Sequence, residues 1–117
     1  ALHRSSDREN RALMTTIRFY CAQGRLSGFS CQGHSGHAEA GHDIVCAAVT
    51  SAIRLAECTI NDVLHAGAAV SVNNRTAEIS LTLPAGHSGG EQILQGLLLY
   101  MRELSKENPN HLTVLEV

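Results

Sequence analysis

The first part of the chain alternates apolar and polar residues with a period of two, a pattern typical of strands that bury one face. The alternation runs over residues 15–21 and again over about 26–33, and it includes Phe19 and Phe29 among its apolar positions. Residues 23–25 contain a glycine and separate the two stretches. The pattern therefore predicts a β-hairpin.

Apolar residues then recur at helical spacing over about 44–65, which predicts a long helix with one buried stripe. Asp43 stands just before it, and a carboxylate there can accept hydrogen bonds from the N–H groups of the first turn. We therefore predict that Asp43 is the N-cap and that Gly67 ends the helix. A second apolar stripe follows residues 88–91, whose Ser-Gly-Gly-Glu sequence has the form of a capping box.

The remaining segments complete the pattern of the fold. Residues 70–83 alternate on either side of Asn73-Asn74, which predicts a second hairpin. Asn108-Pro109 ends the second helix, and residues 112–117 are predicted to add an edge strand. The order β-β-α-β-β-α-β predicts an α+β fold: a two-layer sandwich of an antiparallel sheet with both helices on one face.

The length of the chain bounds its domain organisation. With 117 residues it is long enough for one domain and too short for two. We predict that residues 14–117 form this single domain. Residues 1–13 are polar, lack the alternation of a strand and precede Met14, so we interpret them as an added leader or a disordered N-terminus.

Composition and charge exclude several classes of protein. The chain has 9 Lys and Arg against 11 Asp and Glu, and 3% aromatic residues. It shows neither the basic stripe nor the aromatic platform of nucleic-acid binders. No apolar run approaches the ~20 residues of a membrane span, and no secretory signal is visible. We therefore expect no nucleic-acid partner, no membrane, a cytoplasmic location and four free cysteines.

The candidate chemistry is concentrated in residues 33–50, which read GHSGHAEAGHDIVCAAVT. If Asp43 caps the helix, Cys46 is the third helical residue, close to the positive end of the helix dipole. That position favours the thiolate and lowers the pKa of the thiol, as a nucleophile requires. From position alone, a small buried apolar residue on an alanine-rich helix face is an equally good interpretation of Cys46.

His34 lies twelve residues before Cys46, at the end of the second predicted strand. A loop of this length can fold back and bring the imidazole to the sulfur as a general base, although a plain surface histidine also fits. Asp43 could orient His34 as well as cap the helix. Thr50 lies one helical turn after Cys46, so its hydroxyl could line a site or bond back to the helix. The intervening residues are candidates for a mobile lid or pocket: Ser35, Gly36, Gly41 and His42.

A metal site is the competing interpretation of the same stretch. His34, His37, His42 and Cys46 could offer three nitrogens and one sulfur to zinc. The spacing of the histidines is that of a loop rather than a helix, however, and the sequence has no Cys-x-x-Cys pair. We therefore expect no metal and no other cofactor.

The spaced Gly33-His34 and the Asp-Ile-Val-Cys-Ala of residues 43–47 resemble the signature of the Prp family of ribosomal-processing cysteine proteases, also called YsxB-like. The order of elements from Thr15 to the C-terminus is similar too. Departures are small: Ser35 stands where alanine is common, and Thr50 where serine is common.

The resemblance implies a cysteine endopeptidase with Cys46 as nucleophile and His34 as base. It also implies a homodimer, a loop over the site, and a substrate that is the N-terminal extension of the bacterial large-subunit ribosomal protein L twenty-seven. Backbone N–H groups at the helix start, including that of Cys46, are candidates for an oxyanion hole. Two alternatives remain open, namely a non-catalytic module that binds a ribosomal protein and a zinc-binding structural domain.

Overall fold

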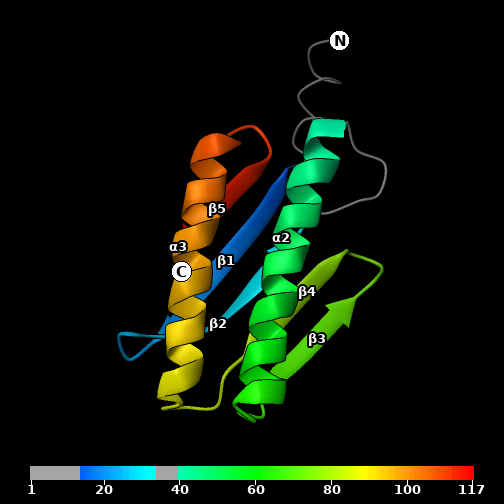
Figure 1. Ribbon diagram of the computed structural model, residues 1–117. Helices are drawn as coiled ribbons and strands as arrows, with labels where there is room; N and C mark the ends of the chain where they lie inside the picture. Colours follow the sequence, from blue (N-terminus) through cyan, green and yellow to red (C-terminus); the bar gives the residue numbers. More distant parts are fainter. Residues whose placement is uncertain (1–13, 34–39) are drawn as a thin grey trace.

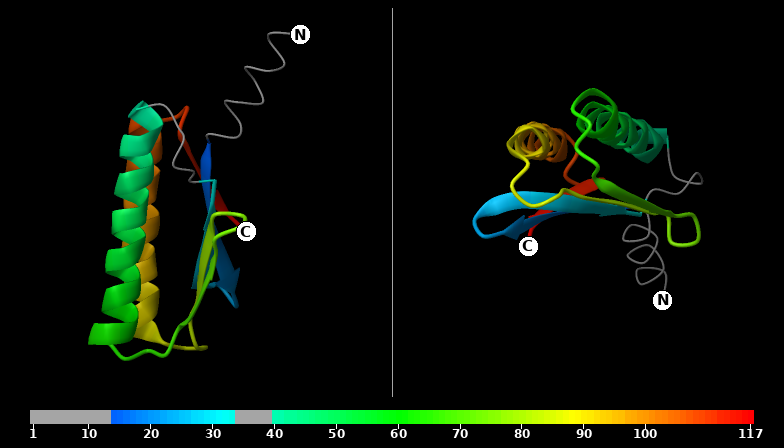
Figure 2. Two further views of the ribbon diagram at one scale, coloured as in Figure 1. Left: turned by 90° about the vertical axis from the view of Figure 1, so that its right-hand side faces the viewer. Right: turned by 90° about the horizontal axis from the view of Figure 1, so that it is seen from below.

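The computed structural model describes residues 14–33 and 40–117 and forms two layers, a five-stranded sheet and a pair of helices. Both helices cover the same face of the sheet and run side by side along it (Figure 1; Figure 2, left). The elements, in chain order, are β1 (Thr15–Ala22), β2 (Arg25–Gln32), α2 (Ala40–Cys58), the short π-helix η1 (Thr59–Val63), β3 (Ala69–Asn73), β4 (Glu78–Thr82), α3 (Ser88–Glu107) and β5 (Leu112–Glu116). The predicted α+β sandwich, its order of elements and its one-sided helices are confirmed.

The sheet has the strand order β3-β4-β2-β1-β5 and is mixed, which corrects the prediction that it is wholly antiparallel. The two hairpin pairs are antiparallel, as is β2 with β4, but β5 runs parallel to β1. The reason is the connection. Helix α3 returns the chain to the end of the sheet at which β4 began, so β5 must run in the direction of β4, which is also that of β1.

The core lies between the sheet and the helices. Alternate residues of β1 and β2 point toward the helices, and the rings of Phe19 and Phe29 stand 6.2 Å apart there. The helices contribute fully buried side chains from their inner faces, among them Val49 on α2 and Leu94 and Met101 on α3. The period-two and helical patterns of the sequence therefore identify the core correctly.

The helix boundaries differ from the predicted ones. Helix α2 begins at Ala40, so Asp43 is its fourth residue and not its N-cap. Helix α3 is capped by His87, one residue before the expected Ser88, and the Nδ1 atom of His87 accepts a hydrogen bond of 2.9 Å from the Gly90 N–H. The far end of α2 continues into η1, and Gly67 follows with a positive φ of 69°.

The sequence pattern predicts no apolar run of the length of a membrane span. The segment Ile44–Val63 corrects this, because it is a helix long and apolar enough, by length and composition, to cross a membrane. One such helix is weak evidence, since the core helix of a soluble protein has the same composition. Here Val45, Val49 and Ile53 of this helix are at most 2% exposed against the sheet. We interpret the segment as a core helix that also exposes Ile44, Leu55 and Val63.

Candidate active site

Cys46 lies in the second turn of α2, on the face that packs against the sheet. Its neighbours Val45 and Val49 are buried in the core, and Cys46 itself is only 9% exposed. Cys31 of β2 is buried in the core and is 1% exposed. Burial, and then the negative charge of Cys46, raise the pKa of the Cys31 thiol to about 12. The thiols of two cysteines distant in sequence, Cys31 and Cys46, therefore interact electrostatically, and nothing in their spacing along the chain predicts this pair.

The early start of α2 changes the electrostatic argument for Cys46. Cys46 is the seventh residue of the helix rather than the third. The field of a helix dipole acts mainly on the first turn, and only the first four N–H groups of a helix lack a partner within it. The N–H group of Cys46 therefore belongs to the helix ladder, which removes it from the predicted oxyanion donors. The predicted stabilisation of the thiolate by the helix start loses most of its basis.

Gly33, the residue just before His34, occupies a position that only glycine fits. Its φ is +98°, a conformation that side-chain-bearing residues rarely adopt, and a Cβ atom there would overlap the carbonyl oxygen of Met14. The end of β2 is thus held tightly against the start of β1. This explains the Gly-His pair in the sequence: the glycine fixes the strand end from which the histidine follows.

The other predicted site residues are only partly placed. Thr50 is half-buried one turn after Cys46 in α2, as predicted from the spacing. The backbone of Gly41, His42 and Asp43 lies within α2. His34, Ser35, Gly36 and His37 lie outside the described residues, as do residues 1–13, so the predicted contact between His34 and Cys46 and the predicted lid stay predictions.

The described part of the chain holds no group of three or more His, Cys, Asp or Glu side chains that could bind a metal. The zinc alternative needs His34 and His37, which fall outside that part. The remaining cysteines, Cys21 and Cys58, are exposed free thiols, and a hydrogen bond to Asp62 raises the pKa of Cys58.

The buried thiol of Cys31 should make the stability of the protein depend on alkaline pH. In the unfolded chain the thiol ionises near the ordinary cysteine pKa of 9.0, whereas the folded state raises the pKa to about 12 and keeps the thiol neutral. Its contribution to stability is therefore complete below pH 9 and decreases by roughly 1.4 kcal/mol per pH unit between those two values. Urea unfolding at pH 7 to 11 should show a shallower alkaline loss for Cys31→Ala than for the wild type. Equal slopes for both proteins would contradict the burial of this thiol.

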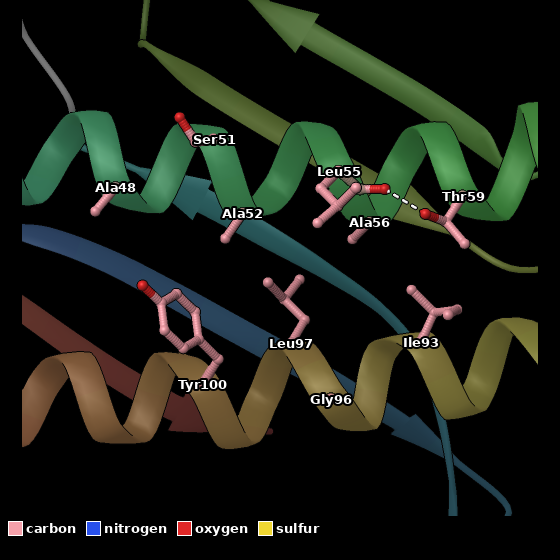
Figure 3. Close-up of a pocket in the computed structure, with 10 residues that line it drawn as sticks. All are labelled: Ala48, Ser51, Ala52, Leu55, Ala56, Thr59, Ile93, Gly96, Leu97 and Tyr100. Atoms are coloured by element: carbon pink, nitrogen blue, oxygen red, sulfur yellow. Dashed lines mark hydrogen bonds between the residues drawn. The ribbon is translucent and has the colours of Figure 1, made fainter.

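A separate groove of about 610 Å³ lies between the two helices and does not include Cys46 (Figure 3). Its lining is mostly apolar, and two of its large side chains are well exposed, Leu55 at 69% and Tyr100 at 50%. Small residues of both helices leave room between them. The lining consists of Ala48, Ser51, Ala52, Leu55, Ala56, Thr59, Ile93, Gly96, Leu97 and Tyr100.

The sequence of residues 14–113 matches the model of the family described as cysteine protease Prp. The chain belongs to the Prp family. It is therefore a cysteine protease. No curated protein matches the sequence closely enough to be compared.

Solved structures share the fold of this Prp family member. A Streptococcus mutans protein superimposes with a TM-score of 0.83 at 20% identity, covering 92% of this chain and 97% of its own. The ribosomal processing protease Prp of Staphylococcus aureus, in complex with a substrate peptide, gives a TM-score of 0.82 at 18% identity, over 89% of this chain and all of that one. The same S. aureus protease with a covalently linked product peptide gives a TM-score of 0.78 at 19% identity, again over 89% of this chain and all of that one.

Proposed function

We propose that this protein is the endopeptidase that removes the N-terminal extension of the bacterial large-subunit ribosomal protein L twenty-seven, in the cytoplasm, with Cys46 as nucleophile and His34 as general base. The proposal is supported by membership of the Prp family and by the fold shared with the S. aureus ribosomal processing protease, which was solved with a substrate peptide. It also follows the Gly-His and Asp-Ile-Val-Cys-Ala motifs of the sequence.

The observation that carries the assignment of the nucleophile is the position of Cys46 among the four cysteines. Cys31 is unsuitable because its pKa of about 12 keeps it a thiol at neutral pH. Cys21 is in β1 next to the β1–β2 turn, and Cys58 ends α2, so both lie at the opposite end of the sandwich from Gly33. Cys46 is in the second turn of α2, and its thiol interacts electrostatically with Cys31, which lies two residues before Gly33.

The reaction then proceeds in two stages. The Sγ atom of Cys46 attacks the scissile carbonyl carbon while His34 takes the thiol proton, and His34 returns that proton to the leaving amine as the peptide bond breaks. Water, deprotonated by His34, next attacks the thioester and releases the acyl part of the substrate, which regenerates the thiol. No cofactor takes part. The proposed role of Thr50, half-buried one turn along α2, is to contact the substrate or the sulfur through its hydroxyl.

Mass spectrometry of the ribosomal protein tests this function. Incubating the extended form of L twenty-seven with the protein should produce one new N-terminus and a mass loss equal to the extension, while the form without the extension should stay intact. Binding of the extended form without any cleavage would instead favour the non-catalytic module. An unchanged mass without binding would contradict both the endopeptidase and the non-catalytic binding module.

We further propose that the protein acts as a homodimer in which two copies meet through the groove between α2 and α3. Support comes from the exposed Leu55 and Tyr100 and from Ala52 and Gly96, whose small size lets another helix approach closely. Substantial apolar surface of this kind is typical of interfaces.

Leu55→Glu should convert this dimer to a monomer, because it places a charge in the apolar groove. Light scattering coupled to size-exclusion chromatography at micromolar concentration measures the change. Leu115→Glu is the matched control, since Leu115 is 41% exposed on β5, on the sheet and away from the groove. A wild-type monomer, or a dimer that Leu55→Glu leaves intact, would show that copies do not meet there.

A further inference from the structure

Strand β3 is an open edge of the sheet. It spans Ala69–Asn73 and pairs with β4 on one side, and no strand of residues 14–33 or 40–117 pairs with its other side. All five residues are exposed. Its sequence, AVSVN, carries no charge, no proline and two valines. Proteins usually block such an edge with a charged residue, a proline or a bulge, because its free N–H and C=O groups can pair with another chain.

The opposite edge, β5, is protected. The Ser105 hydroxyl of α3 donates a hydrogen bond of 2.7 Å to the carbonyl oxygen of Leu112, and Arg102 of α3 forms an ion pair with Glu116. Of the two edges, β3 is therefore the one that is available for a partner.

The side chains of β3 add an apolar surface to this backbone edge. Val70 and Val72 are paired with Leu81 and Ile79 of β4, which contribute to the core on the helix side of the sheet. Yet Val70 is 39% and Val72 61% exposed, because α2 lies over the centre of the sheet and leaves β3 uncovered (Figure 1). Free backbone groups beside alternating apolar contacts are the two elements of recognition by strand addition.

The register connects this edge to Cys46. Val72 is paired with Ile79, and Ile79 is paired with Cys31, whose thiol interacts electrostatically with Cys46. Neighbouring strands are about 4.8 Å apart, so a strand added to β3 would lie roughly 15 Å from Cys31 along this row. An extended chain spans this distance in about five residues. The β3 edge therefore lies within about five extended residues of Cys31 in straight-line distance, a span that a substrate segment on either side of the scissile bond can cover over the surface.

We propose that β3 binds an extended segment of the substrate by strand addition, about five residues from the scissile bond, with uncharged side chains of that segment lying on Val70 and Val72. The inference rests on the proposed function. Pairing with β3 would give the protease additional affinity for an unfolded extension. The competing occupant of the same edge is β3 of a second copy, which would extend the sheet between copies.

The first experiment compares a long peptide, with twelve residues on each side of the scissile bond of the extended ribosomal protein, with a short one of three residues on each side. Val72→Lys should lower kcat/KM for the long peptide about ten-fold relative to the short one, through loss of the strand pairing and its side-chain contacts. Val72→Thr keeps the strand propensity of this position, so it should retain most of the wild-type kcat/KM for the long peptide. Leu115→Lys, on the protected edge, is the matched control and should leave both values unchanged. An unaltered long-to-short ratio in Val72→Lys would overturn the inference.

The second experiment separates this inference from the proposed function. Hydrogen exchange of residues 69–73 is measured in Cys46→Ala with and without the long peptide, so no cleavage is needed. Protection of these amides by the peptide supports strand addition even if the wild type fails to cleave, an outcome that would reject the proposed function alone. Amides that the peptide leaves unprotected, or that become protected by raising the protein concentration without peptide, would overturn the inference.

Discussion

Cys46→Ala is expected to abolish proteolysis while leaving the fold intact. In the proposed mechanism the sulfur of Cys46 forms the covalent bond to the substrate, and alanine offers no nucleophile, so the cleavage rate should decrease by at least about 10³-fold. The structural cost should be small, because the substitution removes one sulfur atom from a helix that already carries Ala47 and Ala48 at the next positions. We expect a loss of about 1 kcal/mol in the free energy of unfolding. Cleavage is measured by chromatography of the peptide products, and folding by thermal unfolding.

The matched controls for this variant are the exposed cysteines. Cys21→Ala and Cys58→Ala remove thiols at the other end of the sandwich and should retain the wild-type rate. Cys31→Ala is less suitable as a control, because the Cys31 thiol interacts electrostatically with Cys46. Cleavage by Cys46→Ala at the wild-type rate, or loss of cleavage in Cys58→Ala, would move the nucleophile elsewhere and reject the proposed mechanism.

The fold was largely predictable because its signals are local. Period-two alternation places Phe19 and Phe29 on the same face of a hairpin, and this follows from the pleat of any strand. Helical spacing identifies the buried stripes of both helices in the same way. The direction of β5 was not predictable at this level, because it depends on where α3 returns the chain, a property of the whole topology rather than of residues 112–117.

The helix starts show the limit of local signals in more detail. Asp43 and Ser88 are both favourable cap residues, yet α2 begins three residues before Asp43 and α3 is capped by His87. An aspartate in the first turn of a helix is also stabilised by the helix dipole, so its presence does not determine which residue is the cap. A histidine nitrogen can accept the same hydrogen bond as a serine hydroxyl, and sequence preferences give it little weight.

The candidate site was predictable as a motif and not as a geometry. The motif predicts Cys46 as the nucleophile and the spacing predicts Thr50 beside it; the structure places both residues in α2, and their roles stay predictions. The electrostatic interaction between Cys31 and Cys46 depends on where the fold places α2 relative to β2, which sequence separation does not encode. The open edge at β3 likewise depends on which strands α2 covers. Both features are properties of the assembled sandwich.

Gly33→Ala is expected to disrupt both stability and catalysis. A φ of +98° costs a residue with a side chain about 1–2 kcal/mol, and here the new methyl group would also overlap the carbonyl oxygen of Met14. To relieve this overlap, the ends of β1 and β2 must separate, and His34 follows Gly33 directly. We therefore expect a lower midpoint of thermal unfolding together with a decrease in kcat for peptide cleavage.

Gly24→Ala provides the matched control, because it separates the cost of a positive φ from the cost of the overlap with Met14. Gly24 also has a positive φ, of 76°, but no atom lies within 4 Å of the position that its Cβ would occupy. It lies in the β1–β2 turn, at the opposite end of the hairpin from Gly33. Gly24→Ala should therefore show the cost of the backbone conformation alone and retain wild-type kcat. The additional destabilisation in Gly33→Ala measures the close approach to Met14, and its loss of kcat measures how strongly that strand end positions His34. If the two variants unfold at the same temperature and cleave at the same rate, the packing of Gly33 against Met14 has no part in the site.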